Sequence, residues 1–289
     1  MHLLAALVLV MIWSTTALAI RWSVDGMAYA SALFGRFVLA AMFTVALVVL
    51  LRQRVPLRRA LPAWLIGGVA TAISMLCTYW AARHVPSGLL AVLFGLGPLT
   101  TALFARLWLQ QRLAGHEWIG IVLGLAGTAV IFGERLQLAP GSGPALAVLL
   151  AAVSIQSAAA VRLKGAAQGL PALTVNAGAL LVCALLSGLW WLAQGAPAPA
   201  AATPRALVAV LYLALVGSAL AFSLYYWLIR ECAPGQVALL SLVSPVCALW
   251  LGKVANGEVL SLRMLTGTVL ILGGLLLHQR HGWRRLLRR

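Results

Sequence analysis

The sequence predicts an all-α integral membrane protein with ten transmembrane helices, and three observations support this fold class. Hydrophobic residues make up 63% of the 289 residues and charged residues only 9%, whereas soluble domains contain about 45–50% and about 25% respectively. The apolar residues fall in runs of about 20, the length that crosses roughly 30 Å of hydrocarbon. The runs are rich in Ala, Leu and Gly and do not alternate in polarity, which argues against the strands of a membrane barrel.

Ten apolar runs follow one another, each bounded by charged residues, proline or glycine. They cover residues 3–20, 28–51, 62–82, 87–109, 116–133, 144–161, 172–193, 205–229, 235–252 and 261–279. The residues that close them, in chain order, are Arg21, Arg52, Arg83, Arg112, Arg135, Arg162, Gly195, Arg230, Lys253 and Arg280. Ala17-Leu18-Ala19 also resembles a signal-peptide cleavage site, but no basic residue precedes the first run, so we expect it to remain as a helix.

The basic residues are divided unequally between the two sides of this arrangement. Fourteen of the 21 Lys and Arg residues fall on the side of the amino terminus and six on the other side. Because cytoplasmic loops retain basic residues, we expect a multi-pass membrane protein with both termini cytoplasmic. The net charge of +16 does not indicate a nucleic-acid partner, since most arginines stand singly or in pairs between apolar runs.

The second half of the chain repeats the first. A five-helix unit that is repeated once crosses the membrane in opposite directions in its two copies, the inverted-repeat architecture of secondary transporters. The sequence therefore predicts two inverted five-helix repeats, at 1–138 and 139–280, followed by a basic cytoplasmic tail at 281–289. A displacement of 147 residues aligns Tyr79-Trp80 with Tyr226-Trp227, Arg83 with Arg230 and Pro98 with Pro245, and a displacement of 143 residues aligns Ser14 with Ser157.

Short motifs occur in a characteristic order along both halves. They are Ile12-Trp13-Ser14, Arg36, Tyr79-Trp80 through Pro86, Gly97-Pro98, Ser244-Pro245 and Gly257-Glu258. With these motifs, the chain resembles the EamA family of the drug/metabolite transporter superfamily over its whole length. The resemblance implies a ten-helix inner-membrane carrier, commonly an exporter of amino acids or related metabolites. The chain departs from the family pattern at Gln111, where an acidic residue is usual, and at Gln156, where a tryptophan is usual, which argues against an aromatic substrate.

Polar residues inside membrane spans usually face a cavity or another helix. The third run carries such residues on one helical face, and the eighth run carries a similar face at the repeat-related positions. Both faces are interpreted as walls of a substrate cavity or, alternatively, as surfaces for helix packing. The residues are Thr71, Ser74, Thr78 and the adjoining Tyr79 in the third run, and Ser218, Phe222 and Tyr225 in the eighth.

Two prolines lie near the middle of predicted spans. Pro98 and Pro245 are expected to kink the fourth and ninth helices and to free a carbonyl, which would accept an ammonium group or serve only the kink. Phe94 and Ser241, one turn earlier, and Ser244 would line the same region.

Further polar residues lie at matching depths in the first and sixth runs. Trp13 and Ser14 correspond to Gln156 and Ser157, and all four are candidates for gates or cavity walls, with helix packing as the alternative. Asn176 in the seventh run is expected to form a hydrogen bond between helices.

Charged residues inside the runs are rare. Arg36 would hold a substrate carboxylate, or would instead bind backbone carbonyls or extend to the interface. The five acidic residues fall in loops or at the ends of runs, so a proton exchange on a buried glutamate is disfavoured. Facilitated diffusion or exchange of a neutral or zwitterionic solute fits better.

We therefore expect a secondary carrier that exports small metabolites, foremost amino acids or related zwitterions, by alternating access around a central cavity. The cavity would lie between the first, third and fourth runs and the sixth, eighth and ninth. The expected partners are the substrate and the lipid bilayer, in a monomer or homodimer, because the glycines of the fifth and tenth runs suit close helix contacts within or between protomers. No cofactor, metal or catalytic group is expected. The alternatives are an exporter of hydrophobic drugs or cations, a membrane-embedded enzyme, and a structural or sensory membrane protein.

Overall fold

The computed structural model describes residues 2–53, 55–110, 114–132, 142–198, 202–231 and 234–278. Within these ranges the regular structure is entirely helical, which confirms the predicted all-α class. Gln111 and the predicted tail at 281–289 lie outside the described residues. The helices are α1 (His2–Gly26), α2 (Tyr29–Leu50), α3 (Leu57–Ala81), α4 (Ser87–Phe94), α5 (Gly97–Leu109), α6 (Gly115–Phe132), α7 (Ser142–Ala166), α8 (Ala172–Ala193), α9 (Pro204–Ala214), the π-helix η2 (Leu215–Leu220), α10 (Ala221–Glu231), α11 (Pro234–Asn256) and α12 (Leu262–His278).

Seven helical segments of the described chain are long and apolar enough to cross a membrane. They are Leu7–Gly26, Tyr29–Leu50, Leu57–Ala81, Ser87–Leu109, Gly143–Ala166, Ala172–Ala193 and Pro204–Tyr225. Gly115–Ile131 and Leu262–Leu277 are shorter apolar helices. Large apolar side chains cover the outside of the bundle, including Met42 at 65% and Trp250 at 69% exposure, as expected for a surface that faces lipid.

Prolines set the starts of four helices. Pro56, Pro86 and Pro171 are the residues that precede α3, α4 and α8, and Pro204 is the first residue of α9. At the first helical position, Pro204 suits α9 because its φ is preset for a helix and its missing N–H would have no partner there. The other three prolines lie just before their helices and interrupt no helical hydrogen bond. Thr203 completes the start of α9, since its side chain accepts a hydrogen bond from the backbone N–H of Ala206 at 3.2 Å.

The fourth predicted span is two helices, and this differs from the expected kink at Pro98. The helix is interrupted at Gly95 and Leu96, and Pro98 lies in the first turn of α5, where its missing N–H costs little. Pro245, by contrast, lies inside α11 as expected. A Cβ atom on Gly95 would come within 3.1 Å of the Pro245 ring, so the interruption is also the place where α11 approaches α4.

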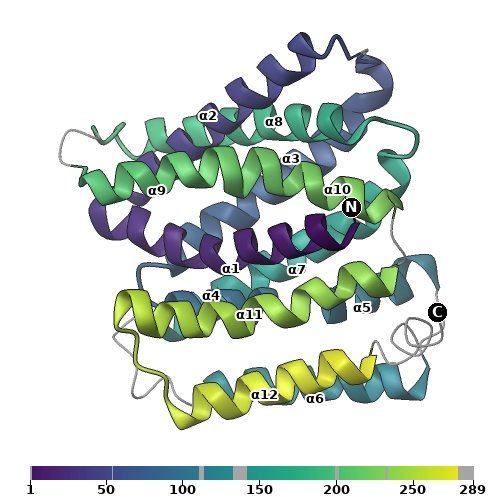
Figure 1. The fold of residues 1–289 in the computed structure, drawn as a ribbon, viewed down its shortest axis with the longest axis vertical. Helices are drawn as coiled ribbons and strands as arrows, with labels where there is room; N and C mark the ends of the chain where they lie inside the picture. The colour runs from purple at the N-terminus through teal and green to yellow at the C-terminus, as the bar shows by residue number, and fades with distance from the viewer. Residues whose placement is uncertain are drawn as a thin grey trace.

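The helices lie side by side in a bundle in which partners come from distant parts of the sequence (Figure 1). Helix α3 packs against α7 and α8, α2 against α8 and α9, and α1 against α9 and α11. Helix α11 also packs against α4, and α5 packs against α7. Helix α1 begins and α12 ends on the same side of the bundle (Figure 1).

Helices α6 and α12 form a close pair at one end of the bundle (Figure 1). A Cβ atom on Gly127 would lie 2.5 Å from the carbonyl oxygen of Gly267, and one on Gly274 would lie 2.5 Å from that of Gly120. These glycines let the two backbones approach each other, as small residues do in membrane helix pairs. Of the two arrangements expected for the glycines, the structure contains the pairing of the two helices within one chain.

The pair predicts opposite effects for two adjacent substitutions in α12. Gly274→Ala should destabilise the protein by about 1–3 kcal/mol, because the added methyl group meets backbone that cannot move aside. Gly273→Ala is the matched control: a Cβ there meets nothing within 4 Å, and alanine favours the helix by about 0.5–1 kcal/mol. Thermal unfolding of the detergent-solubilised variants measures the difference, and equal midpoints would contradict the close pairing.

Candidate functional site

A buried arginine lies at the centre of the polar contacts between helices. Arg36 on α2 is 2% exposed, and its Nε donates to the hydroxyl of Ser218 at 2.9 Å. Its Nη1 lies 3.4 Å from the Tyr79 hydroxyl and 3.9 Å from the Met75 sulfur. Its Nη2 lies 3.5 Å from the carbonyl oxygen of Gly217. The structure therefore brings three predicted site residues, Arg36, Tyr79 and Ser218, together.

The charge of Arg36 is surrounded by neutral groups. The rings of Phe37 and Tyr79 have their centroids 5.5 and 5.9 Å from Cζ of Arg36, a distance at which an aromatic face attracts a cation. The ion pair found in the described part of the chain joins Arg21 to Asp25 in the last turns of α1. Because an ion buried without a counterion is costly, the guanidinium strongly favours an anion at this position.

Two of the residues that contact Arg36 belong to a widened turn of helix. Ser218 and Gly217 belong to η2, and π-turns rearrange backbone hydrogen bonding and are frequent at functional sites. Asn176 of α8, 2% exposed, satisfies two carbonyls of this turn: its Nδ2 lies 3.4 Å from the Ser218 oxygen and 3.3 Å from the Ala219 oxygen. The same Nδ2 lies 3.2 Å from the Ser223 hydroxyl. Asn176 thus joins two helices, as expected from the sequence.

A second polar contact joins α3 to α7. Nε2 of Gln156 donates to the hydroxyl of Thr71 at 3.4 Å. Two buried atoms, Oε1 of Gln156 and Oγ of Ser74 on the α3 turn after Thr71, have no hydrogen-bond partner in the described part of the chain. A small cavity begins at Thr71, and its lining comes from α3, α8 and α10. The lining residues are Thr71, Asn176, Ala179, Leu180, Cys183 and Phe222.

Ser157 lies at a different contact, between α7 and α5. Its hydroxyl lies 2.6 Å from that of Thr100 and donates to the carbonyl oxygen of Gly97 at 3.2 Å. This carbonyl lies next to the break before Pro98. The sequence predicted a free carbonyl acceptor in this region, and the protein itself partly satisfies the acceptors there. Phe94, at the end of α4, packs against the hydrophobic core.

Other predicted residues lie in pairs or bond within their own helices. The rings of Trp13 and Tyr225 are 5.3 Å apart and join α1 to α10. The hydroxyls of Ser14 and Thr78 donate to carbonyl oxygens one turn earlier in their own helices, at 2.7 Å each. Ser244 is buried in α11, and the side chain of Ser241 lies outside the described residues.

Three residues that the sequence did not single out as ligand candidates belong to this region. Asn176 and Cys183 line the cavity from α8, the seventh predicted span, which was not among the helices expected to form it. Met75 contacts Arg36 through its sulfur. Asn176 could have been found from the sequence, because it is a polar residue in an apolar run. Met75 and Cys183 gave no such signal, because both residue types are typical of hydrophobic cores.

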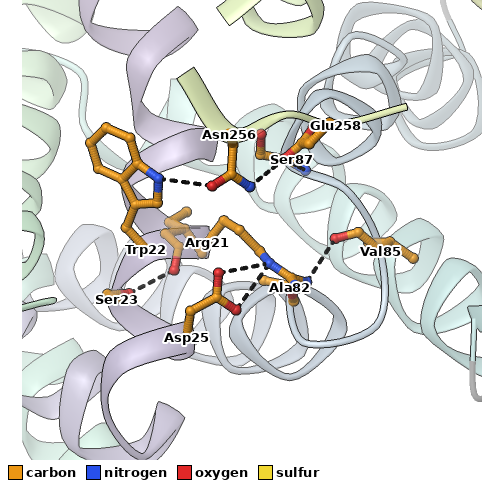
Figure 2. Close-up of polar contacts among 10 residues, drawn as sticks. Arg21, Trp22, Ser23, Asp25, Ala82, Val85, Ser87, Asn256 and Glu258 are labelled. Carbon is orange, nitrogen blue, oxygen red and sulfur yellow. Dashed lines mark hydrogen bonds and ion pairs between the residues drawn. The ribbon is translucent and has the colours of Figure 1, made fainter. Parts of the chain in front are cut away.

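Polar contacts join several helices on the side of the bundle where the chain passes from α11 to α12, which is opposite the start of α1 (Figure 1). The backbone N–H groups of Ser87 and Gly88, at the start of α4, donate to Oε1 and Oε2 of Glu258 at 2.9 and 3.1 Å. Asn256 donates to Oε1 at 3.2 Å and accepts from the Trp22 indole at 3.2 Å (Figure 2). A carboxylate at a helix N-terminus is favourable because it meets unpaired N–H groups and the positive end of the helix dipole.

Arginines extend these contacts around the same end. Arg21 pairs with Asp25 and donates to the carbonyl oxygens of Ala82 and Val85 in the turn between α3 and α4 (Figure 2). Arg205, at the start of α9, lies 4.0 Å from the centroid of a Trp22 ring. Side chains of α1 therefore join elements from both halves of the chain at this end.

Comparison with known proteins identifies the family. The model of the EamA-like transporter family matches residues 1–133 and again residues 143–278. The chain belongs to the EamA-like transporter family. The resemblance stated from the sequence motifs is confirmed, and the predicted membrane transporter class with it.

Several relatives of this EamA-like transporter are known by name. YedA of Escherichia coli K12, described as an uncharacterized inner membrane transporter, is 31% identical over 261 residues, which cover 89% of this chain and 83% of YedA. PecM of Dickeya dadantii is 29% identical over 75% of this chain and 72% of its own. A protein of Streptantibioticus cattleyicolor named "Probable terminal-alkyne amino-acid exporter" is 28% identical over 97% of this chain and 94% of its own. A solved structure titled "Crystal structure of protein" shares the fold with a TM-score of 0.69 at 23% identity, over 99% of this chain and 98% of that one.

Glu258 of this EamA-like transporter should contribute measurably to stability. Glu258→Gln replaces one carboxylate oxygen by an NH2 group and leaves a backbone N–H of α4 without its acceptor, at a cost of about 1–3 kcal/mol. Glu117→Gln is the control, because Glu117 likewise accepts from a backbone N–H, that of Ala114 at the start of its own helix. Thermal unfolding in detergent should show a lower midpoint for Glu258→Gln than for the control, and the reverse order would contradict this assignment.

Proposed function

We propose that the chain is a secondary carrier that exports amino acids or related zwitterions by alternating access. In this proposal it forms ten transmembrane helices in a bacterial inner membrane, as two inverted five-helix repeats at 1–138 and 139–280. Both termini and the basic tail at 281–289 face the cytoplasm. The side of the bundle that carries the Glu258 contacts then faces the periplasm. The substrate binds near the centre of the bundle, which opens to one side of the membrane at a time.

The observation that carries this proposal is the burial of Arg36 among neutral partners. The cost of a buried cation falls when an anion joins it, and the guanidinium fork fits a carboxylate with two parallel hydrogen bonds. Intramembrane ionisable residues usually serve function for this reason. An amino acid brings the carboxylate and, with its own ammonium group, remains neutral overall.

The relatives support the same substrate class and location. The Streptantibioticus cattleyicolor protein, named as an amino-acid exporter, aligns with nearly the whole chain. YedA is named as an inner membrane transporter. The alternative of an exporter of hydrophobic cations is disfavoured, because the field of Arg36 repels a cation in the low dielectric of the bundle.

Transport into liposomes tests the proposal. Purified protein in liposomes should take up at least one of the twenty labelled amino acids in a saturable manner, with and without a pH gradient, because the acidic residues of the described chain, such as Asp25, lie near the ends of spans or outside them. Tetraphenylphosphonium, a lipophilic cation, should not compete. Absence of uptake of every amino acid by monodisperse protein, or accumulation of tetraphenylphosphonium in their place, would overturn the proposed substrate class.

A further inference from the structure

Two polar regions near the centre of the bundle can each bind a charged group of a ligand, and they suit opposite charges. The first belongs to Arg36, whose shortest polar contact is the 2.9 Å hydrogen bond from Nε to Ser218. Its Nη contacts, with Tyr79, Met75 and Gly217, are longer, at 3.4–3.9 Å. The two Nη groups, which form the outer edge of the guanidinium fork, thus retain donor capacity for a carboxylate.

The second region contains hydrogen-bond acceptors that lack a donor. Oε1 of Gln156 is buried and accepts no hydrogen bond within the described chain, and the same holds for Oγ of Ser74, whose residue is fully buried. A buried acceptor without a donor is destabilised relative to one that is satisfied. An ammonium group, with three N–H donors and a positive charge, supplies what both oxygens lack.

The carbonyl oxygens of the π-helix are less suited to an ammonium group. Asn176 already donates to the carbonyls of Ser218 and Ala219, and Arg36 approaches that of Gly217. A cation near this turn would also meet the charge of Arg36 directly. The acceptors on the side of Gln156 are therefore the better place for a positive group.

The α3 residues that Arg36 and Gln156 contact lie about one turn apart. Arg36 contacts Met75, and Gln156 contacts Thr71, four residues earlier on the same helix. One turn corresponds to about 5.4 Å along the axis. An α-amino acid carries its ammonium and carboxylate groups on one carbon, so groups that bind the two from opposite sides stand several ångströms apart.

We propose that Arg36 and Gln156 determine specificity for α-amino acids, with Arg36 holding the substrate carboxylate and Gln156, assisted by Ser74, holding its ammonium group. This inference rests on the proposed function and adds the residues that recognise each charge. The substrate side chain then points into the cavity beside Thr71, toward the apolar surfaces of Leu180 and Phe222. The cavity is small, so the helices separate to admit the substrate, as alternating access requires.

Competition with analogues tests the inference on the wild-type protein. The labelled L-amino acid with the highest uptake in the liposome assay is competed with its own carboxamide, which lacks the carboxylate, and with its deamino acid, which lacks the ammonium group. Each analogue should compete at least about tenfold more weakly than the amino acid, the usual effect of losing a charge-assisted contact. If either analogue competes as well as the amino acid, the inference is overturned while the proposed function stands.

Variants then assign each charge to its residue. In Arg36→Gln the amino acid and its carboxamide should compete equally, and in Gln156→Leu the amino acid and its deamino acid should do so. Loss of packing alone would weaken all competitors in parallel, so a ratio that stays at the wild-type value overturns the assignment. Arg36→Lys, which keeps the charge but not the fork, should give an intermediate ratio and serves if Arg36→Gln does not fold.

A control variant separates recognition from general effects on the bundle. Thr44→Val removes a hydroxyl on α2 that is fully buried and bonds to carbonyls of its own helix. It should keep the wild-type competition ratios. If no amino acid is taken up by the wild-type protein, the proposed function fails, and that outcome is distinct from unchanged ratios in the variants.

Discussion

A guanidinium ion inside a membrane-spanning bundle has to be solvated by the protein, because the hydrocarbon of the lipid provides no hydrogen-bond acceptors. Here that solvation comes from Ser218, the rings of Phe37 and Tyr79, and a carbonyl of η2. The groups come from α2, α3 and the widened turn between α9 and α10, so the position of one charge constrains how three distant parts of the chain meet. Asn176 on α8 then stabilises the carbonyls that the turn exposes.

The two charged regions of the bundle are built on different principles. Glu258, at the helix ends, is matched by backbone N–H groups and by the amide of Asn256, so its carboxylate is satisfied inside the protein. Arg36, in the interior, is matched only by neutral groups in the described chain. Glu258 has three hydrogen bonds of 2.9–3.2 Å, whereas the buried Arg36 has one bond of that length and longer Nη contacts, so Arg36 is the ion that favours a ligand of opposite charge. This contrast separates the closing contacts of the bundle from its recognition site.

Much of the architecture could be predicted from local pattern. The lengths of the apolar runs marked the helices, since a membrane requires about 20 residues for each crossing, and Arg36 stood out as the basic residue inside a run. The break at Gly95 and Leu96 was not predicted; it lies where Pro245 of α11, distant in sequence, comes close to α4. Nor was η2 predicted, whose carbonyl oxygens are approached by Arg36 and Asn176, residues far from it in the sequence. Helix α1 also extends to Gly26, beyond the predicted end at residue 20.

The order in which the partners of Arg36 emerge during synthesis has a consequence for biogenesis. Tyr79 follows Arg36 by 43 residues, but Ser218, which provides the shortest contact, follows by 182. When α2 leaves the ribosome, the strongest partner of its charge has not been translated. The contacts of Arg36 with η2 therefore form only after the second half of the chain has been made. The first half of the chain alone therefore lacks the shortest hydrogen bond of its buried arginine.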